Sequence, residues 1–361
     1  MVAAAYGDRE VRRLGAAKDN ILRGKQMYSV DIHAHFFTSG YIDVLEKHGH
    51  TVGCTVERDC EGLVYITPAG KRTQGPMDPS YYDIDARLEG LERQETDLHA
   101  LSLTNPMCHF ADDSLNLDLA QAYNDGTSEF HVAYPDRFVG LMTVPMLNEA
   151  DAVAEVERAA KLPGMHGVYM GTNVAGHNLA DPRFAAIFDK VAELNLPIFL
   201  HPTNVLGADR LNDYHTINTI GNPTDTAVAA TFLIFGGILD RHPKLEVSLP
   251  HAGGTFPILI GRIDHGWTVR EECKHLKNAP STYLRRFTYD TIGHANYVMK
   301  YLTDLVGPDR VLLGSDYCFD MGHEKPVQNV LGYDWLSDDE KAGIIGLNAA
   351  RILGVDVPAV E

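Results

Sequence analysis

The feature that most constrains this chain is a regular alternation of short apolar segments with longer amphipathic ones, from near residue 28 almost to the C-terminus. The short segments have the length of buried strands, and the longer ones space their apolar residues as helices do. The predicted strands are Tyr28–Phe36, Leu98–Leu103, Phe138–Val144, Gly167–Met170, Pro197–Leu200, Leu245–Leu249, Phe287–Asp290 and Val311–Leu313. Because a helix follows each of these eight strands, the sequence predicts an α/β fold, a (β/α)8 TIM-type barrel.

The alternative architecture is a doubly wound open sheet, which would place a glycine-rich phosphate-binding loop after an early strand. The sequence has no such loop, so the barrel is favoured. Two alternating segments, Thr51–Glu57 and Gly62–Pro68, predict a small β-hairpin insertion after the first strand, at about residues 50–75. Residues 1–27 are expected to form a helical N-terminal arm, and residues 28–361 a single barrel domain.

Charge and cysteine content limit the partners and the compartment. The formal net charge is −18, which argues against nucleic acid or an anionic membrane surface as a partner. No apolar run approaches a transmembrane span of about 20 residues. The five cysteines have no CxxC spacing and no secretory segment precedes them, so we expect free thiols in a cytoplasmic protein.

Polar residues end four of the predicted strands, where a barrel of this kind carries its active site. His33 and His35 share one face of the first strand because side chains alternate with a period of two. His201 ends the fifth strand, His251 the sixth and Asp316 the eighth. Each alone has a structural interpretation, such as a buried histidine or a helix N-cap. Together, polar groups at the ends of four apolar strands favour a shared ligand, since burying them without partners would be costly.

Three imidazoles and one carboxylate predict a site for one divalent metal ion, with zinc as the first choice and manganese as the alternative. The predicted ligands are His33, His35, His201 and Asp316, and the fourth strand offers no lysine or acid to bridge a second ion. His251 precedes a glycine-rich turn that can aim its ring across the pocket, so we expect it to act as general acid/base. Asp316 is expected to be catalytic as well, by exchanging a proton.

Several longer runs carry a family resemblance. They are Asp31–His35, Gly314–Tyr317 and residues 234–245, 251–257, 262–266 and 348–354. These runs resemble the amidohydrolase superfamily and, more narrowly, the aminocarboxymuconate-semialdehyde decarboxylase family, over nearly the whole chain after residue 28. The resemblance implies a barrel, a dimer and a zinc-dependent decarboxylation that needs no oxygen. It also implies the same metal ligands and the same catalytic histidine as the strand ends do.

The resemblance further implies which residues hold the substrate. Arg87 and Arg262 match arginines that bind substrate carboxylates, and Arg262 would reach into the site of the neighbouring subunit of a homodimer. In an acidic protein, carboxylates need such guanidinium partners. Asn173 and Thr203 stand where the decarboxylase family has a histidine and an aromatic residue, so they are predicted to line the substrate side.

The sequence therefore predicts a metal-dependent, oxygen-independent decarboxylase, a carbon–carbon lyase of aromatic compound catabolism. Its substrate would be a small unsaturated or aromatic carboxylic acid of the carboxymuconate semialdehyde or hydroxybenzoate type. One alternative is a metal-dependent hydrolase or hydratase acting on a ring-cleavage product, because barrels host many chemistries. A scaffold or sensor with a vestigial site is a second alternative, and it would hold metal substoichiometrically.

Overall fold

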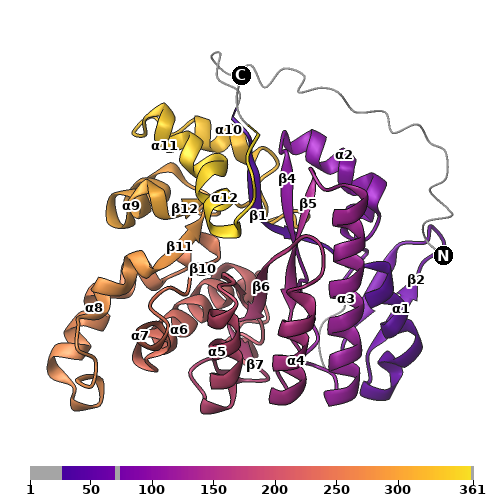
Figure 1. Ribbon diagram of the computed structural model, residues 1–361, viewed down its shortest axis with the longest axis horizontal. Coiled ribbons are helices and arrows are strands. Elements are labelled where there is room, and N and C mark those ends of the chain that lie inside the picture. The colour runs from indigo at the N-terminus through magenta and orange to yellow at the C-terminus, as the bar shows by residue number, and fades with distance from the viewer. Residues whose placement is uncertain (1–26, 70–73, 359–361) are drawn as a thin grey trace.

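The computed structural model describes residues 27–69 and 74–358 of the chain, so most of the predicted N-terminal arm lies outside the described residues. At its centre is an eight-stranded parallel sheet in the order β1-β4-β5-β6-β9-β10-β11-β12 (Figure 1). The strands are β1 Val30–His35, β4 Leu98–Ser102, β5 Phe138–Thr143, β6 Met165–Gly171, β9 Ile198–His201, β10 Val247–Leu249, β11 Phe287–Asp290 and β12 Val311–Leu312. Because spatial order follows chain order, the predicted TIM-type barrel is confirmed.

Helices surround the sheet and cover its outer face (Figure 1). They are α1 Ser39–His48, α2 Ile84–Gln94, α3 Asp113–Ala133, α4 Glu149–Ala159, α5 Ala185–Glu193, α6 Asn222–Phe235, α7 Ile238–Arg241, α8 Phe256–Val269, α9 Asn296–Val306, α10 Pro326–Leu331, α11 Asp338–Ala342 and α12 Asn348–Leu353. Side-chain caps start several of them: Asp83 accepts a hydrogen bond from the backbone of α2, and Asp112 does the same for α3.

Two short antiparallel pairs lie outside the barrel sheet. The predicted hairpin is confirmed as β2 Thr55–Arg58 paired with β3 Val64–Thr67, between α1 and α2. A second pair, β7 Asn173–Val174 with β8 His177–Asn178, follows β6 and was not predicted from the sequence. It shapes the loop on the side of the barrel where the strands end.

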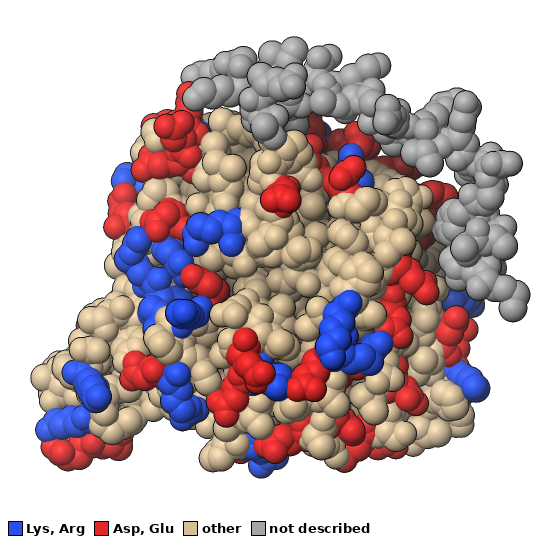
Figure 2. Space-filling model, viewed as in Figure 1, with Lys and Arg blue, Asp and Glu red and all other residues tan. Residues whose placement is uncertain are grey.

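The strands of the barrel are buried at every position except His166 in β6, as expected for a parallel sheet covered by helices. Acidic and basic side chains are interspersed on the face shown in Figure 2, with 49 acidic residues against 31 basic ones in the whole chain. All five cysteines are free thiols, as predicted. In the part of the chain that the structure describes, no helix has both the length and the apolar character needed to cross a bilayer.

The first and last strands of the barrel meet differently from all other neighbours. From β1–β4 round to β11–β12, adjacent strands form parallel ladders. Strands β1 and β12 do not pair in this way; an isolated bridge joins Ala34 to Tyr317, which lies beyond the end of β12. We call this junction, formed by residues 30–35 and 311–317, the seam.

Candidate active site

The polar residues that end the predicted strands converge at one end of the barrel. One ligand atom from each of His33, His201, His251 and Asp316 lies within 4.8 Å of all the others. His35 joins them, with its Nε2 3.1 Å from both His33 Nε2 and Asp316 Oδ1. Four of the five are buried, and the side chain of His251 is only 13% exposed. The convergence that the sequence predicted is therefore present.

The spacing of the donor atoms fits a single metal ion. Two ligands bound tetrahedrally at about 2.1 Å from one zinc lie about 3.4 Å apart. The observed separations are 3.1 Å from His33 Nε2 to His35 Nε2, 3.1 Å from His35 Nε2 to Asp316 Oδ1, and 3.4 Å from His33 Nε2 to Asp316 Oδ1. Nitrogen and carboxylate donors are also the types that zinc and manganese accept in proteins.

Hydrogen bonds fix the orientation of three of these rings. His33 Nδ1 donates to Asp290 Oδ2 at 2.9 Å. His35 Nδ1 lies 3.1 Å from Ser102 Oγ, and His201 Nδ1 lies 3.1 Å from the carbonyl oxygen of the next residue. In each ring Nδ1 is occupied, so Nε2 is left to face the common centre. Such outer partners hold ring orientation and tautomer in metal sites.

Burial and neighbouring charges shift the pKa values of this group in different directions. Burial lowers the pKa of His35 to about 4 and holds that of His201 well below its usual range, so both imidazoles are neutral. Burial alone would also lower the pKa of His33, but the carboxylates of Asp290 and Asp316 raise it. For Asp316 itself, burial acts to raise the pKa, yet hydrogen bonds from neighbouring histidines hold it well below its usual range. Asp316 is therefore an ionised carboxylate.

His251 is held differently from the other three histidines. It follows β10 with a positive φ of 55°, and its backbone N donates to Asp290 Oδ2 at 2.9 Å. Its Nδ1 is buried without a hydrogen-bond partner among the described residues, and its Nε2 lies 3.8 Å from Asp316 Oδ2. A cavity of about 320 Å³ opens beside it, with His294 and Met321 on its walls. His251 thus contacts the space that a small molecule would occupy.

Comparison with known proteins places the chain in a family. A family model described as amidohydrolase matches residues 30–355. The chain belongs to the amidohydrolase family. It is 32% identical over 330 residues to 2-amino-3-carboxymuconate-6-semialdehyde decarboxylase of Dictyostelium discoideum, covering 91% of this chain and 92% of that protein. It is 27% identical to gamma-resorcylate decarboxylase of Rhizobium sp. (strain MTP-10005), covering 75% and 87%.

Among solved structures, this amidohydrolase resembles 5-carboxyvanillate decarboxylase LigW from Sphingomonas paucimobilis. The TM-score is 0.79 at 25% identity, with 92% of this chain and 100% of that one covered. All three of these relatives are decarboxylases. The protein is a carboxy-lyase of the amidohydrolase superfamily, as the sequence predicted, and the hydrolase and scaffold alternatives are not favoured.

The two arginines expected to hold substrate lie away from the cavity of this amidohydrolase. Arg87 is 0% exposed, its guanidinium donates to the carbonyl oxygen of His35, and it does not line the cavity beside His251. Arg262 is exposed on α8, a helix that extends away from the sheet at the lower left of Figure 1. Neither placement supports a direct contact with a substrate in the same subunit.

Asn173 and Thr203 contact each other in the loops after β6 and β9, and neither lines the cavity beside His251. Asn173 Nδ2 donates to the carbonyl oxygen of Thr203 and, at 3.1 Å, to Asp225 Oδ2. Asp225, in the first turn of α6, also accepts from the hydroxyl of Thr172 and from Leu206 N at 3.2 Å. The buried carboxylate of Asp225 therefore organises the loops after β6 and β9, a role that sequence inspection missed.

Asp290 is the second residue that sequence inspection missed. It ends β11, and its carboxylate accepts from His33 Nδ1 and from the backbone N of His251, Ala252 and Ile292 at 2.8–3.0 Å. The rule that located the ligands, a polar residue ending a buried strand, applies to Asp290 as well. It was overlooked because the predicted strand Phe287–Asp290 is weakly patterned.

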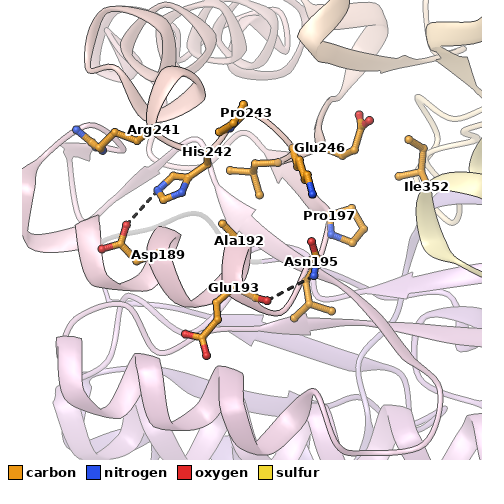
Figure 3. Close-up of a pocket in the computed structure, with 13 residues that line it drawn as sticks. Asp189, Ala192, Glu193, Asn195, Pro197, Arg241, His242, Pro243, Glu246 and Ile352 are labelled. Atoms are coloured by element: carbon orange, nitrogen blue, oxygen red, sulfur yellow. Dashed lines mark hydrogen bonds and ion pairs between the residues drawn. The ribbon is translucent and has the colours of Figure 1, made fainter.

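Figure 3 shows a second hollow, of about 350 Å³. Its walls include Pro197 and Glu246, which precede β9 and β10, so it faces the ends where those strands begin. His242 in its wall is paired with Asp189 at 3.1 Å. This hollow is slightly larger than the cavity at His251, but among residues 27–69 and 74–358 it brings no group of metal-binding side chains together, in keeping with active sites at the C-terminal ends of barrel strands.

Proposed function

We propose that this protein removes CO2 from an unsaturated or aromatic carboxylic acid of the carboxymuconate semialdehyde or hydroxybenzoate type, with the help of one divalent metal ion. The observation that carries the proposal is the group of oriented imidazoles and one ionised carboxylate beside a cavity of about 320 Å³. The decarboxylases to which the chain is similar act on acids of these two types by name.

His33, His35, His201 and Asp316 would hold the ion. The occupied Nδ1 atoms of the three histidines support this assignment, whereas the unpartnered Nδ1 of His251 supports a role outside the ligand set. Zinc is our first choice and manganese the alternative, since both accept nitrogen and oxygen donors. When bound, the ion supplies a Lewis acid that polarises substrate oxygens and stabilises the charge that develops as the C–C bond breaks.

His251 would supply the proton. A protonated imidazole donates H⁺ to the carbon that carries the carboxylate, which forms a C–H bond and interrupts the conjugation. The C–C bond to the carboxylate then breaks, CO2 leaves, and the electron pair of that bond restores the conjugated system. Histidine suits this role because its pKa lies near neutrality. Asp316, whose Oδ2 lies 3.8 Å from His251 Nε2, would hold the imidazolium and exchange the proton with it.

A second copy of the chain would complete the substrate site. Apolar side chains on α8 are exposed, with Ile258 67% and Val269 53% accessible, and a homodimer would cover them. Arg262 lies on the same helix and would bind a substrate carboxylate in the partner's site. Asn173 and Thr203 would shape the substrate side of the cavity, and the free thiols suit a cytoplasmic location.

The test is to load the full chain with zinc or with manganese and screen hydroxybenzoates and carboxymuconate semialdehydes for CO2 release without an added cosubstrate. His251→Ala should keep its metal, because His251 is no ligand, and lose about 10²–10⁴-fold in kcat, as expected when a general acid is removed. The matched control is His242→Ala at the other end of the barrel. This variant should keep its metal and its kcat. Full turnover by His251→Ala, or hydrolysis of lactones with no CO2 from any acid, would overturn the proposal.

A further inference from the structure

Arg87 is a buried cation with few partners. Its side chain is 0% exposed on α2, and of its three guanidinium nitrogens only Nη2 donates a hydrogen bond, to the carbonyl oxygen of His35. Nε and Nη1 have no hydrogen-bond partner among the described residues. Burying a charge with so little compensation is unfavourable for folding. An apolar side chain would fill this space at lower cost, so the guanidinium points to a specific task.

The guanidinium lies between two aromatic rings that follow metal-binding positions. Its central carbon is 5.2 Å from the ring centroid of Phe36 and 4.7 Å from that of Tyr317. Phe36 directly follows His35, and Tyr317 directly follows Asp316. A guanidinium over an aromatic face is attracted by the ring electrons, most strongly when water is excluded. Arg87 therefore contacts both strand ends of the seam at once.

Three backbone hydrogen bonds cross the seam, and the first runs from Ile32 N to the carbonyl oxygen of Leu313 at 2.9 Å. His35 N donates to the carbonyl oxygen of Tyr317 at 2.6 Å, and Asp316 N donates to that of His33 at 2.9 Å. These bonds join the two strand ends, which otherwise share only one isolated bridge, so side-chain contacts at this level add to what holds His35 beside Asp316. Arg87 bonds the carbonyl oxygen of His35 at this level of the seam and does not line the cavity beside His251.

Two further residues on the face of α2 that carries Arg87 also lie against Tyr317. Gly90, three residues after Arg87, has no room for a side chain because a Cβ there would collide with the hydroxyl of Tyr317. Arg93, three residues further on, donates from Nη2 to that hydroxyl at 2.8 Å. Residues three apart on a helix share a face. One face of α2 is thus shaped to hold the residue next to Asp316.

We propose that Arg87 is a positioning residue that fastens the seam and so fixes the 3.1 Å separation between His35 Nε2 and Asp316 Oδ1. The guanidinium holds the β1 side through the carbonyl of His35 and the β12 side through the ring of Tyr317. It acts through the metal ligands and does not touch substrate. The inference rests on the proposed function, because it takes His35 and Asp316 as ligands.

The test compares Arg87→Met and Arg87→Lys with the matched control Arg137→Met. Arg137 also contacts α2, through Glu92 at 2.9 Å, but not the seam. Metal-depleted protein is titrated with Co²⁺, whose visible spectrum reports ligand geometry, and with Zn²⁺. Arg87→Met should bind both ions at least about tenfold more weakly, as for other outer-sphere changes, with an altered cobalt spectrum. At saturating metal its kcat should fall while KM stays within about twofold of the wild-type value, because a positioning residue does not touch substrate.

Arg87→Lys should recover part of the affinity, since an ammonium can donate to the carbonyl but cannot stack as a planar guanidinium does. Arg137→Met should match the wild type. Wild-type metal affinity in Arg87→Met together with a raised KM would overturn the inference and return Arg87 to substrate binding. If Arg87→Met does not fold, an unchanged affinity and spectrum in Arg87→Lys would overturn it instead. Failure of the wild type to bind metal would refute the proposed function, a separate result.

Discussion

The two sides of the candidate metal centre are built in different ways. His201 ends β9, which pairs with β6 at four consecutive positions, from Val168 with Ile198 to Gly171 with His201. On the opposite side, the seam brings His35 and Asp316 together with one isolated bridge. We call the β6–β9 side the ladder side. A ladder of four consecutive pairs positions its ligand, whereas the seam combines three backbone hydrogen bonds with buried side-chain contacts.

Side-chain support is visible all along the seam. Asp31, buried in β1, accepts from Ser315 N at 3.1 Å and from His33 N at 2.9 Å, and Ser315 Oγ donates to it as well. Asp316 has a positive φ of 59°, which is unfavourable for a residue with a side chain. An irregular junction lets the chain turn ligands inward at angles that a ladder would not allow. Its stability must then come from buried polar contacts, which are expensive to break.

Removing the metal should have the largest effect, and it should affect the seam more than the ladder side. An ion present at about 1,000 times its Kd stabilises the folded chain by about 4 kcal/mol, so chelation should lower Tm clearly. Amide hydrogen exchange should then accelerate most at the seam, at Ile32, His35 and Asp316, because the ion bridges its two strands. Amides in β6 and β9 should change less, since their ladder remains. Equal acceleration on both sides would contradict the distinction.

Asp290→Asn should weaken the metal site without a general loss of structure. The carboxylate of Asp290 accepts from His33 Nδ1 and from the backbone of the turn that carries His251. Losing its charge should reduce metal affinity about 10–100-fold, as found for outer partners of ligating histidines. Metal titration measures this, with circular dichroism as the control for folding. Unchanged affinity would mean that His33 is oriented by packing alone.

Asp225→Asn tests the ladder side, where we expect a different outcome. Its Oδ2 accepts from the hydroxyl of Thr172 and from the amide of Asn173, so an amide nitrogen in that place would face donors. The mismatch should cost about 1–3 kcal/mol of folding free energy. Metal affinity should stay near the wild-type value because His201 is held by the ladder, while KM rises as the loops after β6 and β9 shift. A loss of metal as large as in Asp290→Asn would remove the contrast.

The features that could be predicted from the sequence are those that depend on a local pattern of residues. Apolar runs of strand length located the barrel, and polar residues at their ends located His33, His201 and Asp316, because the topology of a barrel brings such ends together. The same rule also applies to Asp290, which ends the buried strand β11. The family resemblance added Arg262, whose proposed role depends on a second copy of the chain.

What stayed hidden depends on contacts between distant segments. Arg87 lies three residues after Ile84 and four before Leu91, so helical spacing places it on the buried face of α2, but no pattern along the chain shows that this face meets the seam. Asp225 has a sufficient local explanation as an acidic residue in the first turn of α6, which complements the helix dipole. That explanation concealed its hydrogen bonds to residues about 50 positions earlier.

The smallest effect should come from Arg93→Ala, at the outer edge of the seam. Arg93 is exposed and contributes a single 2.8 Å hydrogen bond to the hydroxyl of Tyr317. Removing this side chain should lower the free energy of unfolding by at most about 1 kcal/mol, because water can replace the donor. Tyr317→Phe removes the same bond from the other side, together with a hydrogen bond to Ser80, so the double variant should be no less stable than Tyr317→Phe alone. Denaturant unfolding of the four proteins measures this. A loss of metal affinity in Arg93→Ala as large as that expected for Arg87→Met would show that the whole face of α2, and not the buried guanidinium, fixes the seam.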